Sequence, residues 1–248
     1  MRKIEFSHYS HHLNRNMNIK IYGHYGITFL IFPCQDGMSD DFEINGMISC
    51  LSNFIESGQI KLVCVDSIDY ETYSNKFGNY EHIAYMQEKY VQYIIDEVMP
   101  IIYEENQGFT LPYVSGCSMG ATQASILFFR RPDLFRGVLG LSGCYEISYF
   151  WNNWCNHDIY NNSPVKFLRQ IPNDHPYIHL YNQKNIVFCV GNGAWEHLVS
   201  WSHYQLKEIL ESKGINAWMD TWGDDVAHHW YWWEKQYQYF IPKLIENY

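Results

Sequence analysis

The residues of this chain that are best suited to chemistry form a short motif around Ser118. The run Gly116-Cys117-Ser118-Met119-Gly120 fits the pattern G-x-S-x-G, and it stands between an apolar run at 111–115 and a helical pattern at 121–129. A serine on a tight strand-to-helix turn holds its hydroxyl above the sheet, and flanking glycines let the strand and helix pass closely. The helix that follows adds backbone N–H groups and a positive dipole end, which stabilise an oxyanion. The motif therefore predicts a serine nucleophile at position 118.

A serine nucleophile needs a base that takes its proton and an acid that orients the base. In folds that carry a serine on such a turn, the three residues follow the chain order Ser, acid, His. The acid and the histidine lie on loops at the carboxyl ends of later strands. The base is then expected between the last strand and the last helix, where His228 and His229 both lie. The acid is expected after the apolar run at 186–190, where the segment 191–197 offers one carboxylate, Glu196.

Each of these residues also has a plain alternative explanation. Ser118 fits an ordinary β–α turn, His228 a surface loop, and Glu196 the first turn of a helix, where an acid interacts well with the dipole. We favour the catalytic interpretation because the three occur in the required order, each at a predicted strand exit. Cys117 is a rival nucleophile, but it is the variable position of the motif, so its side chain is expected to point into the sheet layer.

The segments that must position these residues alternate between strands and helices. Apolar runs typical of buried strands are separated by patterns with apolar spacings of three and four. Such alternation indicates an α/β class with a mostly parallel central sheet and helices on both faces. The first two strands are expected to form an antiparallel edge. Strands are predicted at residues 2–10, 18–23, 26–33, 60–66, 111–115, 137–143, 185–192 and 215–222, and helices at 42–57, 82–106 (interrupted by Pro100), 121–134, 165–170, 197–213 and 231–247.

The chain is predicted to form one domain over residues 1–248. Residues 144–181 break the alternation and are rich in Trp, Asn, His and Pro, so we expect them to form a lid or a pocket wall. Most of the nine Trp and 21 Tyr are expected in the core, and the rest in a binding cleft, because aromatic rings pack on sugar or aryl faces. We predict that Gln35, Trp195 and Trp230 contact the substrate.

Charge and composition argue against several kinds of partner. The net charge is −10, and no cluster of basic residues is larger than a pair such as Arg130-Arg131, so we predict no nucleic acid partner. No segment has the ~18 consecutive apolar residues of a membrane helix, so we predict no membrane partner. The chain has no C-x-x-C spacing, and the histidine pairs His11-His12 and His228-His229 are adjacent instead of four residues apart. We therefore predict no metal and no other cofactor. A homo-oligomer is compatible with the sequence.

The cysteines and the first residues bear on the location of the protein. The seven cysteines are odd in number, and several stand in apolar, strand-like runs, which suits reduced, buried thiols. The segment 1–6 carries an acidic residue and leads into no apolar stretch, unlike a secretory signal peptide. We therefore expect a cytoplasmic protein.

Four segments carry a resemblance to a known family. They are Gly116-Cys117-Ser118-Met119-Gly120, the run from Tyr93 to Pro100, Gly191-Asn192-Gly193 followed by Glu196, and His228-His229-Trp230-Tyr231-Trp232-Trp233. Over roughly residues 25–245 the chain resembles the putative-esterase branch of the α/β-hydrolases. That branch includes S-formylglutathione hydrolase, feruloyl esterase domains and the mycolyltransferases. The resemblance implies an α/β-hydrolase fold and serine esterase activity.

The resemblance also implies which base and which acid act on Ser118. In the family, a tryptophan typically stands two positions after the catalytic histidine, in the pattern H-x-W. This pattern selects His228 over His229. The mycolyltransferases similarly use a glutamate just after a G-N-G turn, which favours Glu196. Many other members use an aspartate there, and Asp225 is the second candidate for the acid.

The same resemblance implies which backbone N–H groups bind the oxyanion. One donor is the residue after the nucleophile, Met119. The second lies on the loop after the first central strand, where Asp36-Gly37-Met38 is similar to the mycolyltransferase loop and implies Met38. The loop also resembles a shorter glycine-rich version, which implies Gly37 or Gln35 instead.

These inferences together predict a serine carboxylesterase that forms an acyl-enzyme on Ser118. The substrate is expected to be a small-molecule or carbohydrate ester with an acyl or aryl group. Two other functions are consistent with the sequence. One is an acyltransferase that uses the same triad and passes the acyl group to a bound alcohol. The other is a non-catalytic, glycan-binding module with an α/β-hydrolase-like fold.

Overall fold

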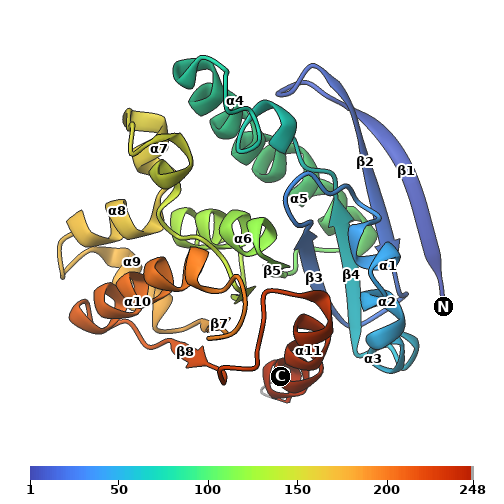
Figure 1. Ribbon diagram of the computed structural model, residues 1–248. Coiled ribbons are helices and arrows are strands. Elements are labelled where there is room, and N and C mark those ends of the chain that lie inside the picture. Colours follow the sequence, from blue (N-terminus) through green and yellow to red (C-terminus); the bar gives the residue numbers. More distant parts are fainter. Residues whose placement is uncertain (247–248) are drawn as a thin grey trace.

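A computed structural model describes residues 1–246, and its centre is one eight-stranded sheet (Figure 1). The strands lie in the order β1-β2-β4-β3-β5-β6-β7-β8. The hairpin of β1 and β2 is antiparallel and pairs antiparallel with β4, whereas β4, β3 and β5 to β8 run parallel. The predicted parallel sheet with an antiparallel edge is therefore confirmed. The strands are β1 (Lys3–Ser10), β2 (Arg15–Tyr22), β3 (Ile27–Phe32), β4 (Ile60–Val65), β5 (Tyr113–Cys117), β6 (Gly137–Leu141), β7 (Asn185–Val190) and β8 (Trp218–Thr221).

The burial of each strand follows from its place in the sheet. Every residue of β4, β5 and β6 is buried, because helices cover both faces of the parallel part of the sheet. In β1, exposed and half-buried residues alternate, as expected for an edge strand with one solvated face. The continuous apolar runs of the sequence thus identify the inner strands.

Two apolar clusters hold the helices against the two faces of the sheet (Figure 1). One cluster joins the sheet to α4, α5, α6, α8 and α10, and includes Ala124 and Leu206. The other joins the opposite face to the segment α1–α3 and to α11, and includes Phe42 and Phe240. The helices of these layers are α1 (Asp41–Ile44), α2 (Met47–Cys50), α3 (Ser52–Glu56), α4 (Tyr80–Tyr93), α5 (Met99–Glu105), α6 (Met119–Arg130), α8 (Pro164–Gln170), α10 (His197–Ser212) and α11 (Trp230–Ile245).

The prediction of one helix at 42–57 is wrong. The segment forms the three short helices α1, α2 and α3. The first break occurs at Gly46, whose φ of 81° lies in the left-handed region. The side chain of Asn45 donates to the carbonyl of Asp41 at 2.8 Å, which satisfies a terminal acceptor of α1. Ile44 is one of the apolar residues whose spacing suggested a single helix, and yet it is 72% exposed.

The interruption predicted at Pro100 does not occur. The helix α4 continues through a π-helical turn, η2 (Ile94–Val98), directly into α5. Pro100 stands in the first turn of α5, where a missing N–H is tolerated. At the end of the chain, the predicted helix 231–247 is found as α11, and Asn247 lies outside the described residues.

The predicted insertion 144–181 consists of short helices that share the main core. Ile147, Ile159 and Leu168 are buried in the same cluster as α6 and α10. The helix predicted at 165–170 corresponds to α8. The other helices of the insertion are η3 (Ile147–Trp151), α7 (His157–Asn161) and α9 (Pro176–Tyr181). Over residues 1–246, no helix is both long enough and apolar enough to cross a membrane.

Candidate active site

Ser118 stands at the sharp turn between β5 and α6. Its φ of 54° and ψ of −120° are unusual for a residue with a side chain, and such strain is common at functional sites. A Cβ on Gly120 would lie 2.2 Å from the carbonyl oxygen of Phe32, and one on Gly116 would lie 2.5 Å from the carbonyl carbon of Gly120. Both positions of the motif therefore require glycine, because strand and helix touch there backbone to backbone.

His228 and Glu196 lie in line with the Ser118 hydroxyl. The His228 Nε2 is 2.8 Å from Ser118 Oγ, and its Nδ1 is 3.5 Å from Glu196 Oε2. This arrangement suits an imidazole that carries its proton on Nδ1 and accepts the serine proton at Nε2. The side chain of His228 is 19% exposed and that of Glu196 is 1% exposed. The carboxylate therefore acts on the imidazole from the protein interior.

The structure does not bring the two competing residues into this arrangement. Asp225 is exposed on the loop before His228. His229 is also exposed, and its Nδ1 accepts the backbone N–H of Tyr231 at 3.2 Å, which caps the start of α11. The three residues selected from the sequence are thus the ones that meet, although 110 positions separate Ser118 from His228.

Met119 offers one backbone donor beside the serine. It is the first residue of α6, so its N–H has no acceptor within the helix. The resemblance implies that the second donor lies on the loop after β3. In that loop, the N–H of Cys34 donates to Asp41 Oδ2 at 2.8 Å, and the N–H of Gly37 donates to the Cys34 carbonyl at 2.9 Å. These two amides are therefore already engaged.

Gln35 and Met38 are the predicted alternatives that remain, and they face different cavities. Gln35 lines the same pocket as Ser118 and Met119. Met38 instead lines a cavity beside β2 that also contains Lys20. The structure thus brings Gln35, and not Met38, to the serine.

The pocket over Ser118 has a volume of about 220 Å³, and apart from His228 its lining side chains carry no charge. Trp195 stands at its mouth, 65% exposed and with a φ of 69°. Trp230 does not line the pocket, because its ring packs edge-on against Phe42 and Trp233, at centroid distances of 5.7 and 5.1 Å. The complete lining is Gln35, Ser118, Met119, Thr122, Cys144, Tyr149, Phe150, Trp195, Leu198, Val199 and His228.

Several of these lining residues were not identified from the sequence. Tyr149 and Phe150 come from the 144–181 segment, whose aromatic content signalled a pocket wall without singling out residues. Thr122 lies one helical turn after Ser118, on the same side of α6, so its place could have been inferred from the spacing. No sequence pattern marks Leu198 as a residue of the pocket, apart from its position shortly after Glu196.

Cys117 is buried in the apolar cluster on the face of the sheet that α11 covers. Burial raises the pKa of its thiol well above the usual range, which disfavours the nucleophilic thiolate. Among residues 1–246, no group of three or more His, Cys, Asp or Glu side chains is placed to hold a metal ion.

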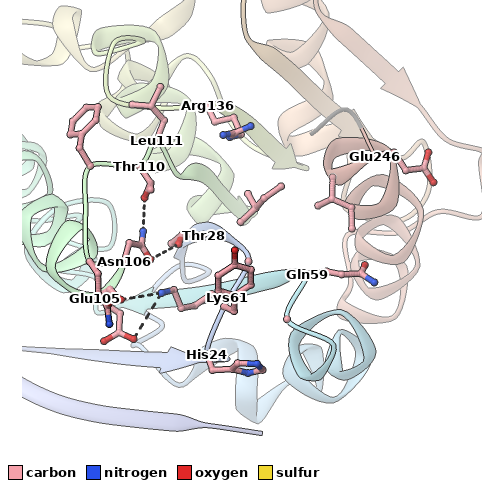
Figure 2. Close-up of a pocket in the computed structure, with 17 residues that line it drawn as sticks. His24, Thr28, Gln59, Lys61, Glu105, Asn106, Thr110, Leu111, Arg136 and Glu246 are labelled. Carbon is pink, nitrogen blue, oxygen red and sulfur yellow. Dashed lines mark hydrogen bonds and ion pairs between the residues drawn. The ribbon is translucent and has the colours of Figure 1, made fainter.

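A larger cavity, of about 960 Å³, shares no lining residue with the pocket over Ser118; Figure 2 shows the residues that line it. It contains residues from the amino ends of parallel strands, such as Thr28 and Lys61, whereas Ser118, Glu196 and His228 follow carboxyl ends. Figure 2 shows Lys61 directed toward Glu105, whose carboxylate is 3.9 Å from the ammonium group. The two cavities therefore open at opposite ends of the strands.

A buried acid, Asp69, holds the loop that carries Gln35. Asp69 Oδ2 accepts the N–H of Asp36 at 3.0 Å, and its other oxygen has no hydrogen-bond partner among the described residues. Burial raises the pKa of Asp69 to about 7. In the unfolded chain, an aspartate titrates near ~3.9. Between about pH 4 and 7 the folded state therefore keeps a proton that the unfolded state has lost, and this contribution to stability decreases as pH rises, by up to ~1.4 kcal/mol per pH unit.

Replacing Asp69 by asparagine should remove this pH dependence, because the amide keeps an acceptor for the Asp36 N–H and cannot ionise. We expect Asp69→Asn to be more stable than the wild type at pH 8, by roughly 2 kcal/mol, with a smaller difference at pH 5. Urea unfolding of both proteins at the two pH values measures the difference. A stability difference that is the same at both pH values would contradict a raised pKa of Asp69 in the folded protein.

A mostly parallel sheet with helices on both faces, and a serine on the turn after an inner strand, define the α/β-hydrolase fold. In a comparison with known protein families, residues 10–247 match the family described as "Putative esterase". The chain belongs to this esterase family, and the resemblance predicted from the sequence is confirmed.

Several solved structures share the fold along nearly their whole length. A ferulic acid esterase superposes with a TM-score of 0.75 at 14% identity, covering 100% of this chain and 98% of that chain. An S-formylglutathione hydrolase from Agrobacterium tumefaciens gives 0.74 at 12% identity, covering 98% and 94%. MPT51 from Mycobacterium tuberculosis gives 0.73 at 11% identity, covering 99% and 98%. At such low identities the likeness concerns the fold alone. A comparison with curated protein sequences finds no significant match.

Proposed function

We propose that this protein is a serine carboxylesterase that hydrolyses small, uncharged acyl or aryl esters through an acyl-enzyme on Ser118. The observation that carries the proposal is the 2.8 Å separation between His228 Nε2 and Ser118 Oγ, with Glu196 behind the imidazole. Membership of an esterase family gives independent support.

In the proposed first step, His228 takes the hydroxyl proton while Ser118 Oγ forms a bond to the ester carbonyl carbon. The resulting oxyanion accepts hydrogen bonds from the N–H groups of Met119 and Gln35. When the C–O bond of the ester breaks, His228 returns the proton to the leaving alcohol. A water molecule, deprotonated by His228, then attacks the acyl carbon. The bond from that carbon to Ser118 Oγ breaks, His228 returns the proton to Ser118 Oγ, and the carboxylic acid leaves.

The lining of the pocket supports a small and uncharged substrate. Its volume of about 220 Å³ is small, and its walls include the rings of Phe150 and Tyr149. A charged acyl group would be desolvated there without a partner of opposite charge. Trp195, largely exposed at the mouth, offers a flat apolar surface for an aryl or sugar ring of the substrate. We propose that the 144–181 segment acts as the wall of this pocket.

The proposal is tested with a panel of esters. It comprises nitrophenyl esters from acetate to octanoate, methyl ferulate and acetylated xylan, each with and without an added alcohol. We expect hydrolysis that is fastest for the short or aryl acyl groups. A folded protein that hydrolyses none of these esters but binds glycans would instead be the non-catalytic module. Formation of new esters at the expense of free acid, when alcohol is added, would identify an acyltransferase.

We also propose a cytoplasmic location. All seven cysteines are free thiols, and four of them are buried. Reduced thiols of this kind are usual in reducing compartments. Fractionation of cells that express the full chain, followed by immunodetection, tests this proposal, and recovery in the medium would contradict it.

A further inference from the structure

Ser142 lies directly beneath the catalytic residues and has no role in the mechanism above. It follows the last residue of β6 and is 1% exposed. Its φ of 54° is in the left-handed region, where residues with side chains rarely lie. Ser118, at the exit of the neighbouring strand β5, has the same φ. Two adjacent inner strands thus both end in a serine with a strained backbone.

The hydrogen bonds of Ser142 fix the direction of its hydroxyl proton. The indole Nε1 of Trp233 can only donate, and it lies 3.1 Å from Ser142 Oγ. The hydroxyl oxygen therefore accepts from Trp233, and its single proton is free to go to Glu196 Oε1, which is 2.7 Å away.

This hydroxyl is the shortest contact of the buried acid. Glu196 is 0% exposed, and a buried carboxylate is stable only when donors face its oxygens. Ser142 binds one oxygen at 2.7 Å, whereas the other lies 3.5 Å from His228 Nδ1. The position of the carboxylate is thus set mainly by Ser142. The ring of Trp233 also packs edge-on against the His228 ring, with centroids 4.9 Å apart.

We propose that Ser142 is a positioning residue of the triad, which holds Glu196 so that Oε2 faces His228, and that Trp233 orients the Ser142 hydroxyl. This inference rests on the proposed esterase function. It extends the Ser118, His228 and Glu196 arrangement into a chain of five side chains. The strained backbone at position 142 has a reason in this arrangement, because it places the hydroxyl against the carboxylate.

The variant Ser142→Gly separates positioning from folding. Glycine adopts a φ of 54° without strain, which offsets part of the cost of the hydrogen bonds that Glu196 and Trp233 lose, so the variant should fold with a melting temperature at or somewhat below that of the wild type. It should nevertheless lose about 10- to 100-fold in kcat, the usual effect of removing an outer support of a site, with little change in KM. Gln107→Gly is the matched control, because Gln107 is exposed, also has a positive φ of 55° and lies away from the triad. We expect its kcat to be that of the wild type.

A double-mutant cycle with Glu196→Gln decides whether Ser142 acts through the acid. If it does, Ser142→Gly should cause little further loss of kcat once Glu196 is replaced. Trp233→Phe, which keeps a ring against His228 but removes the indole N–H, should give a smaller loss in the same direction. A wild-type kcat for Ser142→Gly, or an equal loss of kcat with and without Glu196, would overturn the inference about Ser142. The proposed esterase function would be unaffected. A wild-type protein that neither hydrolyses esters nor reacts with a fluorophosphonate would overturn the proposed function, and this inference with it.

Discussion

Replacing Ser118 by alanine is expected to lower kcat for ester hydrolysis by about 10⁴- to 10⁶-fold. Alanine offers no oxygen that can form the acyl-enzyme, and His228 is left to activate water alone. The Met119 and Gln35 amides would still bind the oxyanion, so a small residual rate above the uncatalysed reaction is expected. Steady-state kinetics on the best ester of the panel gives the ratio.

The neighbouring Cys117→Ala variant is the control for this experiment. Its thiol is buried behind the turn, so its removal should leave kcat within a few-fold of the wild type. Melting curves of both variants exclude unfolding as the cause of a loss. If Ser118→Ala kept most of the activity while Cys117→Ala lost it, the thiol would be the nucleophile.

Replacing Glu196 by glutamine is expected to lower kcat by about 10³- to 10⁴-fold, with a smaller change in KM. The amide is nearly isosteric with the carboxylate, so the loss measures the negative charge and the acceptor that face His228 Nδ1. In the wild type these hold the imidazole in the correct tautomer and stabilise the imidazolium that forms in each step. The buried position of Glu196 strengthens this effect, because water screens it little.

Asp225→Asn is the matched control, because Asp225 was the second candidate for the acid and lies exposed on the loop before His228. We expect its kcat to stay close to that of the wild type. The opposite pattern, in which Asp225→Asn is inactive and Glu196→Gln is active, would transfer the role of the acid to Asp225.

The inner strands and the candidate catalytic residues could be located from the sequence because their signals are local. A strand that is buried on both faces is a nearly continuous apolar run, as in residues 186–190 of β7 and, apart from Lys61, in β4. The turn at Ser118 needs glycine on both sides for steric reasons, and these glycines are visible in the sequence. The order of strands and helices then limits the acid and the base to two short loops, which contain Glu196 and His228.

The features that were predicted incorrectly or not at all depend on contacts between distant segments. The apolar spacing at 42–57 suggested one helix, but the left-handed Gly46 and the side chain of Asn45 end it early. Trp230 was expected to contact the substrate, and instead its ring packs against Phe42 of α1 and Trp233 of its own helix, α11.

The supports of the site were invisible for a similar reason. Ser142 reaches Glu196 across 54 positions of the chain, and Asp69 reaches the Asp36 amide across 33. The choice between Gln35 and Met38 also required the folded structure, because both stand in the same short segment and differ in the cavity that they line. Sequence patterns thus indicate the candidate reacting residues, whereas the residues proposed to hold them in place are found only in the folded structure.

The most direct test of the central claim is to treat the purified wild-type protein with a fluorophosphonate and to locate the adduct by mass spectrometry of its peptides. We predict one adduct per chain, on Ser118, and none in Ser118→Ala. His228→Ala should react far more slowly, because the hydroxyl then lacks its base. An unmodified Ser118 peptide in the folded wild-type protein, or an adduct on another residue, would contradict an acyl-enzyme at Ser118.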